Sequence, residues 1–502
     1  MGKLTPITAS FMLLLALGPQ VGHAAADDVA NLKAELEALK SDYSTRVQAL
    51  EARIKQLEND VAAAKAALPG GSPGAPPAPG PTSVAGTSPA PEPAAASTGQ
   101  QAAPPPVAGP AYSTPPEPGK GGGATAFNPQ ISMILTGNYA SLSQDPATYR
   151  IAGFIPSAQE GPGNRSFNLD ESELTVASNV DPYFYANVTA AIQGDNSIDI
   201  EEAYFKTLAL NHGFTIKGGR FFSGIGYLNE IHSHNWDFVD QPLVYQALLG
   251  GQLGQDGAQV RWLAPTDVFL ELGAEAGSGR SFPGTQRNSN SLASDALFAH
   301  VGGDVGDSTS WRIGVSWLDD RASDRSYQDV DQFGTPVLNE FSGTSRTWIV
   351  DGTLKWAPHG DPTIHLFKLQ GEYMRRTESG QLAFDVTGPD FSNDYRSSQS
   401  GWYVQGVYEF MPRWRAGLRY DSLDSGSMRI GLVTSALLPL SAFPSLLPAS
   451  PERTTFMIDW SLSEFSRLRA QYAWDDARAS ERDRQLLLQY IFAIGAHGAH
   501  KF

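Results

Sequence analysis

The chain has no cysteine, which excludes disulfides, thiolate metal sites, a cysteine nucleophile and a lipidated cysteine behind a leader. Beyond its first 25 residues it also lacks any uninterrupted apolar run of about 18 residues, so no transmembrane helix is expected there. Basic residues are scarce: 36 Lys and Arg against 53 Asp and Glu leave a net charge of −17. We therefore expect no nucleic-acid partner, because phosphates require a basic surface. A membrane role remains open only for strands, whose lipid-facing and water-facing residues alternate.

The N-terminus has the features of a targeting segment. Lys3 precedes an apolar run from Ile7 to Leu17, and small residues occupy 24–26. A basic start, a short apolar core and small residues at the cleavage point are typical of a secretory leader. We predict a signal peptide at residues 1–25.

Residues 27–68 carry an apolar or small side chain at every third or fourth position, with charged residues between them. Such a narrow seam is buried by pairing with copies of itself, and one extra four-residue step near Tyr43 is a stutter that locally unwinds the supercoil. We predict an α-helical coiled coil here; a lone amphipathic helix is the alternative.

Residues 69–126 are rich in proline, alanine and glycine. Sixteen of the 35 prolines fall between 69 and 123, and charged residues are few. This composition cannot form a core, so we predict a disordered, partly extended linker that joins the coil flexibly to the C-terminal segment.

From 127 to 502 the dominant pattern has a period of two residues. In residues 311–317 the odd positions are apolar and the even ones are Arg, Gly and Ser, and residues 414–420 and 467–474 alternate in the same way. Alternation of this kind predicts strands with one apolar and one wet face. The sixteen segments that show it lie near 131–140, 167–178, 184–193, 200–209, 214–222, 258–263, 267–276, 296–305, 309–319, 346–357, 363–376, 400–410, 414–422, 454–462, 466–476 and 484–495.

The lengths of the connections alternate as well. Even-to-odd connections are short, whereas odd-to-even connections are mostly long. The long ones are predicted at 141–166, 223–257, 277–295, 320–345, 377–399 and 423–453, with short exceptions at 194–199 and 477–483. Tight turns at one end and long loops at the other are typical of an up-and-down transmembrane β-barrel, and an even strand number returns both ends to the periplasm. Nine of the ten Trp lie on these strands, as interfacial aromatic girdles require.

Three short motifs carry a resemblance to a known family. They are Asp-Pro-Tyr at 181–183, Ile-Glu-Glu-Ala-Tyr-Phe at 200–205 and Ile-Lys-Gly-Gly-Arg-Phe at 216–221. This part of the chain resembles the phosphate-selective porin O/P family of outer-membrane barrels, and the order of leader, coil, linker and barrel is similar to trimeric dicarboxylate porins. The resemblance implies a porin-like barrel. Phosphate selectivity is not carried over, because the barrel segment has five Lys and no lysine ladder is visible.

Charged residues on the wet faces of the strands are the candidates for a solute path. A column of guanidinium groups facing water offers an anion several weak successive sites, and opposed acidic and basic walls would orient dipolar solutes. The alternative is that these charges pair across strands and only maintain the barrel. The predicted pore-lining residues are Lys217, Arg220, Glu271, Glu372, Glu409, Arg413, Arg415, Arg419, Arg467 and Arg469, and Glu171 and Glu173 are predicted to face the same interior.

The third long loop, 223–257, contains the only Trp outside the predicted strands and two histidines two positions apart. Folded inward, it would narrow the pore. The predicted constriction residues are Glu230, His232, His234, Trp236, Asp237 and Asp240. Imidazole with a carboxylate such as Glu230 or Asp237 suits zinc, but the spacing is loose and hydrogen-bonded packing of the loop is the preferred interpretation.

We therefore expect an outer-membrane porin of a Gram-negative bacterium that passes small hydrophilic solutes, anions among them, by passive diffusion and without a cofactor. The expected partners are outer-membrane lipid and lipopolysaccharide, two further copies in a homotrimer, and peptidoglycan at the periplasmic coil. The alternative is a structural anchor whose coil contacts the cell wall. No His-Glu-x-x-His motif and no phosphate loop occurs, and no enzyme activity is predicted.

Overall fold

The computed structural model describes residues 129–157, 160–285 and 288–495, together with Lys55. The predicted signal peptide (1–25), coiled coil (27–68) and linker (69–126) lie outside these residues, apart from Lys55, which is helical. Within the described part, no helix is long and apolar enough to cross a membrane.

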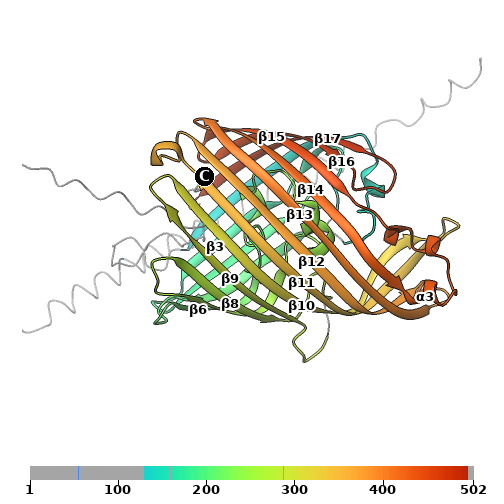
Figure 1. Ribbon diagram of the computed structural model, residues 1–502. Helices are drawn as coiled ribbons and strands as arrows, with labels where there is room; N and C mark the ends of the chain where they lie inside the picture. The colour runs from blue at the N-terminus through green and yellow to red at the C-terminus, as the bar shows by residue number, and fades with distance from the viewer. Residues whose placement is uncertain (1–54, 56–128, 158–159, 286–287, 496–502) are drawn as a thin grey trace, which may run out of the picture. The chain divides into compact units, whose positions relative to one another are not determined.

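The described chain forms one closed antiparallel barrel (Figure 1). Every strand pairs with its sequence neighbour, and β1 closes the ring by pairing with β17. Because β2 and β3 both pair with successive parts of β1, they act as one interrupted strand, and the barrel has the predicted sixteen. The elements are β1 (Gln130–Leu142), β2 (Ser166–Leu169), β3 (Ser172–Asn179), β4 (Phe184–Ile192), β5 (Ile198–Thr207), β6 (Phe214–Phe222), α2 (Leu243–Leu249), β7 (Gly254–Leu263), β8 (Phe269–Gly277), β9 (Ser294–Val305), β10 (Thr309–Val330), β11 (Pro336–Trp356), β12 (Leu366–Phe384), β13 (Phe391–Met411), β14 (Trp414–Ile430), α3 (Gly431–Thr434), β15 (Glu452–Ser463), β16 (Ser466–Asp475) and β17 (Asp483–Gly495).

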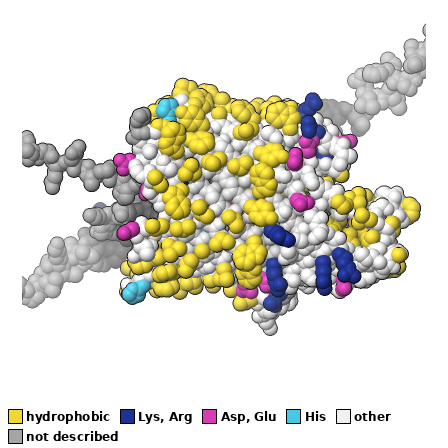
Figure 2. Space-filling model, in the orientation of Figure 1, with side chains coloured by type: hydrophobic (Ala, Val, Ile, Leu, Met, Phe, Trp, Pro, Cys, Tyr) yellow, Lys and Arg dark blue, Asp and Glu magenta, His cyan; other side chains and the backbone are white. Residues whose placement is uncertain are grey.

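The alternation predicted from the sequence is confirmed in the walls. On β10, Ile313 and Val315 are exposed outward, whereas Gly314 and Ser316 between them are buried. Trp317 of β10 faces Trp348 of β11 in register on the outer surface. Figure 2 shows the result on the face it presents, where apolar side chains are spread over the surface and charged side chains are few across its middle.

The predicted loops at 320–345 and 377–399 are wrong in extent. These residues continue β10 to β13 as long hairpins, and β14 likewise runs to Ile430. The sequence pattern did not indicate the extension because its outward-facing residues are polar. On β12 the exposed positions change from Leu369 and Tyr373 to Arg375 and Thr377. Where a strand extends beyond the apolar layer of the membrane, its outward-facing residues are no longer apolar. The backbone hydrogen-bond ladder continues, but the alternation of apolar and polar residues is lost. Figure 1 shows these hairpins reaching past the other strands toward α3.

The third loop, now bounded as residues 223–253, runs through the barrel interior and contains α2. All seven residues of α2 are buried. All of them except Gln246 belong to an apolar cluster that includes inward-facing residues of β10, β11 and β12, namely Leu318, Ile349 and Met374. The Asp421 carboxylate on β14 accepts a hydrogen bond from the Leu243 amide at the start of the helix (2.9 Å).

The helix ends at Gly250, whose φ of +67° is left-handed. A Cβ atom there would also lie 2.7 Å from the Phe282 side chain, so glycine fits both the turn and the close approach. The hydrogen bond to the Leu243 amide and the turn at Gly250 therefore define the two ends of α2.

Candidate functional site

Glu372 on β12 is the central anchor of the third loop. Its carboxylate accepts hydrogen bonds from the backbone amides of Tyr227 and Leu228, each at 3.1 Å, and from the Tyr245 hydroxyl at 2.9 and 3.0 Å. The Tyr403 hydroxyl on β13 donates a further bond of 2.8 Å. A carboxylate with this many donors is satisfied in a buried position, so Glu372 binds the loop rather than standing free in the lumen.

Asp237 joins the loop to the basic side of the barrel. Lys368 Nζ on β12 lies 2.8 Å from its Oδ2, and Arg415 Nη1 on β14 lies 3.2 Å from its Oδ1. Arg415 also pairs with Asp459 on β15 at 2.6 Å. Burial alone would raise the pKa of Asp237, but Lys368 and Arg415 outweigh burial and hold it below its usual range.

Asp240 makes the second such junction. Arg419 Nη2 on β14 lies 2.9 Å from Oδ1, and Arg453 Nη1 on β15 lies 2.6 Å from Oδ2. Arg469 on β16 donates to the carbonyl oxygen of Trp236 at 2.7 Å. These guanidinium groups come from three consecutive strands, so the basic wall is continuous where the loop crosses it.

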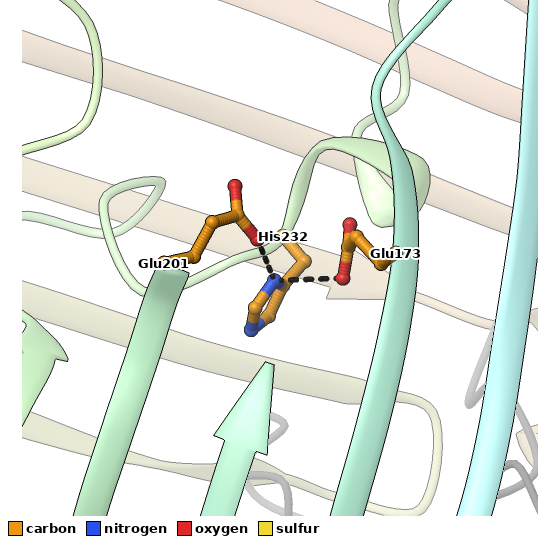
Figure 3. A group of neighbouring side chains, drawn as sticks. All are labelled: Glu173, Glu201 and His232. Carbon is orange, nitrogen blue, oxygen red and sulfur yellow. Dashed lines mark ion pairs between the residues drawn. The ribbon is translucent and has the colours of Figure 1, made fainter. Parts of the chain in front are cut away.

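The two histidines of the loop face the opposite kind of wall. His232 Nδ1 lies 3.0 Å from Glu173 on β3 and 3.4 Å from Glu201 on β5, and its Nε2 lies 3.2 Å from Glu202. His234 Nδ1 lies 2.7 Å from Glu173. Burial would lower the pKa of His232, but the surrounding carboxylates raise it well above the ordinary value. Figure 3 shows His232 between the two strand carboxylates.

Glu230 completes the contacts of the loop with the wall. It pairs with Arg261 on β7, and Lys217 on β6 lies 3.7 Å away. Nearby, His300 Nδ1 on β9 lies 3.0 Å from Glu271 on β8. Glu230 and Asp237, the acids first considered as zinc partners for the histidines, are thus both engaged with cations.

The remaining predicted residues occupy three other positions on the barrel. Arg220 is on the opposite face of β6 from Lys217 and bonds Asp256 at 2.7 Å. Arg413 lies in the tight turn between β13 and β14, where its amide donates to Glu409 at 3.1 Å. Arg467 is buried on β16, on the same face as Arg469.

The sequence interpretation missed several residues of the network, among them Glu201, Glu202 and Arg261 as well as Lys368, Arg453 and Asp459. Lys368 shares the parity of Glu372 within a predicted strand, and Asp459 shares the parity of Arg453 on β15. Extending the wet-face pattern to every charged position on a strand would have found Lys368 and Asp459. Arg453 required the strand to begin two residues earlier than predicted.

Known proteins similar to this chain include one relative in sequence and several barrels in structure. No family model matches the chain, so membership in the phosphate-selective porin O/P family stays a prediction. An uncharacterized protein of Aquifex aeolicus is 29% identical over 402 residues, covering 75% of this chain and 80% of that protein.

Among solved structures, three outer-membrane proteins illustrate the matches, each covering 73% of this chain. OmpT of Vibrio cholerae is 11% identical with a TM-score of 0.45, covering 97% of that chain. The outer membrane channel DcaP of Acinetobacter baumannii is 12% identical with a TM-score of 0.42, also covering 97%. An anion-selective porin from Comamonas acidovorans is 10% identical with a TM-score of 0.44, covering 99%.

Proposed function

We propose that this protein is an outer-membrane porin that passes small hydrophilic solutes, anions among them, by passive diffusion. The observation that carries the proposal is the division of the barrel wall into an apolar outer face and a charged inner face. An apolar outside requires lipid rather than water around the barrel, and a charged inside is typical of a water-filled passage.

The third loop is the proposed constriction. It is bound on one side to cations of β12, β14 and β15 and on the other to carboxylates of β3 and β5. A solute that passes beside it meets acidic and basic groups held in fixed positions. Because most of these charges are already paired, they offer weak, successive contacts rather than one deep well, as rapid passage requires.

Single-channel recording tests this function. The purified full chain, added to a planar lipid bilayer, is expected to give discrete conductance steps. A variant lacking residues 27–126 is expected to give the same steps, because the barrel is closed by strands within 130–495. A folded protein that stays electrically silent and instead retains peptidoglycan would favour the alternative, a structural anchor with a cell-wall-binding coil.

The extended hairpins support an outer-membrane location with lipopolysaccharide as a partner. Arg321, Arg346 and Arg375 are exposed on three consecutive strands, β10, β11 and β12, and the register places each within two positions of the arginine on the adjacent strand. Figure 2 shows basic side chains gathered near this edge of the apolar surface. Guanidinium groups at this level suit the phosphates of a lipopolysaccharide.

Replacing these three arginines with Ala is expected to weaken lipopolysaccharide binding to the detergent-solubilised barrel severalfold without unfolding it, because exposed charges contribute little to stability. Surface plasmon resonance measures the binding. The control replaces Arg478, which is half-buried, and Arg482, which is exposed; both lie between β16 and β17. Equal losses in the two variants would contradict a specific site.

Residues 1–126 belong to the same proposal. We propose a leader at 1–25, a periplasmic coiled coil at 27–68 and a linker at 69–126, with the coil joining three copies of the barrel. The narrow apolar seam of the coil supports self-association, since a single helix would leave the seam exposed. Mass measurement in detergent with and without residues 27–68 checks the contribution of the coil to assembly.

A further inference from the structure

One histidine of the third loop is surrounded by potential metal ligands from two strands. His232 Nδ1, Glu173 Oε2 and Glu201 Oε2 point toward one another (Figure 3), and the ligand atoms of the three residues all lie within 4.8 Å of one another. Because two strands separated by β4 hold the carboxylates and the loop carries the imidazole, the donors converge without belonging to one local sequence motif.

Two of these atoms are buried and unsatisfied. Neither His232 Nδ1 nor Glu201 Oε2 makes a hydrogen bond of good geometry among the described residues. The Glu201 side chain is only 10% exposed, and that of Glu173 only 2%. A buried carboxylate oxygen without a donor is costly, and a bound cation would satisfy it.

The neighbours of His232 orient it as a ligand. Its Nε2 lies 3.2 Å from Glu202 Oε2, so an Nε2–H group would donate to Glu202 and leave Nδ1 free to bind a cation. His234 Nδ1, in turn, lies 2.7 Å from Glu173 Oε1, the oxygen that does not face His232 Nδ1. Carboxylates that fix the far nitrogen of an imidazole are the usual outer shell of protein metal sites.

The charge at the site also favours a cation. Three carboxylates, Glu173, Glu201 and Glu202, face the two histidines. Even with both imidazoles protonated, three negative and two positive charges leave one negative charge in excess. One nitrogen and two carboxylate oxygens are donors that zinc and similar divalent transition metals accept.

We infer that Glu173, Glu201 and His232 form a binding site for a divalent transition-metal cation that fastens the third loop to β3 and β5. The bound cation replaces the imidazole proton as the partner of the two carboxylates. Its role is to hold the loop. The site is independent of whether the barrel conducts.

Zinc binding to the full chain in detergent tests the inference. The protein is prepared without a polyhistidine tag, stripped with a chelator and titrated with Zn²⁺ against a chromophoric competitor. Wild type is expected to bind one tight equivalent. Glu201→Gln is expected to weaken that equivalent at least tenfold, because it removes a ligand charge and no hydrogen bond. His300 is a buried histidine whose ion pair involves one acid, Glu271. His300→Gln is therefore the matched control and is expected to keep the tight zinc equivalent.

X-ray absorption of the zinc-loaded wild type provides a readout that needs no variant. It is expected to show a mixed nitrogen and oxygen shell at about 2.0–2.2 Å, and far-UV circular dichroism checks that each variant is folded. Equal affinities in wild type and Glu201→Gln, no tight equivalent in wild type, or an oxygen-only shell would overturn the site.

Discussion

Replacing Glu372 with Ala is expected to release the third loop from the barrel wall. The substitution leaves two backbone amides and the hydroxyls of Tyr245 and Tyr403 without their acceptor inside the barrel. Each buried donor left unpaired costs about 1–3 kcal/mol. Because such losses are not additive, we expect a total on the order of 4 kcal/mol.

This loss is expected in the loop and not in the barrel. The loop can open while the sixteen strands stay paired, so the cost appears as local opening. Hydrogen exchange followed by mass spectrometry is expected to show faster exchange across residues 226–249, with the strands unchanged. Glu372→Gln keeps one oxygen acceptor, so its exchange across the loop is expected to lie between that of wild type and that of Glu372→Ala. Glu340→Ala, on the other face of the β11 hairpin, is the control. Unchanged exchange in Glu372→Ala would show that the apolar packing of α2 alone holds the loop.

Replacing both Asp237 and Asp240 with Asn is expected to shift ion selectivity strongly toward anions. Both carboxylates neutralise cations of the wall, Asp237 at Lys368 and Asp240 at Arg453. Asn removes the charge and keeps one of the two oxygen acceptors, so each position also loses one of its two contacts with a cation. A unit charge about 4 Å away is worth about 1 kcal/mol even in water, which corresponds to roughly fivefold in relative permeability.

Reversal potentials in a salt gradient measure this shift. Asp424→Asn is the matched control, because Asp424 lies on β14 but is exposed and retains its bond to the Gly426 amide. A reversal potential that does not move in the double variant would mean that solutes do not pass beside these residues. High salt is expected to shrink the effect, since screening shortens the range of each charge.

Only part of the candidate site could be predicted from the sequence. The inward direction of Arg415, Arg419 and Arg469 followed from alternation, because each lies on a strand whose other face is apolar. Alternation does not place Arg220 on the same face as Lys217. Arg220 lies three positions after Lys217 and is therefore on the opposite face of β6. Partners were beyond reach: nothing local links Asp237 to Lys368, which is 131 residues away.

The sequence by itself determined the barrel, its strand number and the identity of its third loop, because side chains that alternate between lipid and interior leave a period of two in the chain. Only the tertiary structure decided which charges meet. The loop crosses the interior and brings His232 to acids of β3 and β5, and Asp240 to cations of β14 and β15. Those distances are fixed when the strands close into a barrel, and the period-two pattern of the sequence gives no information about them.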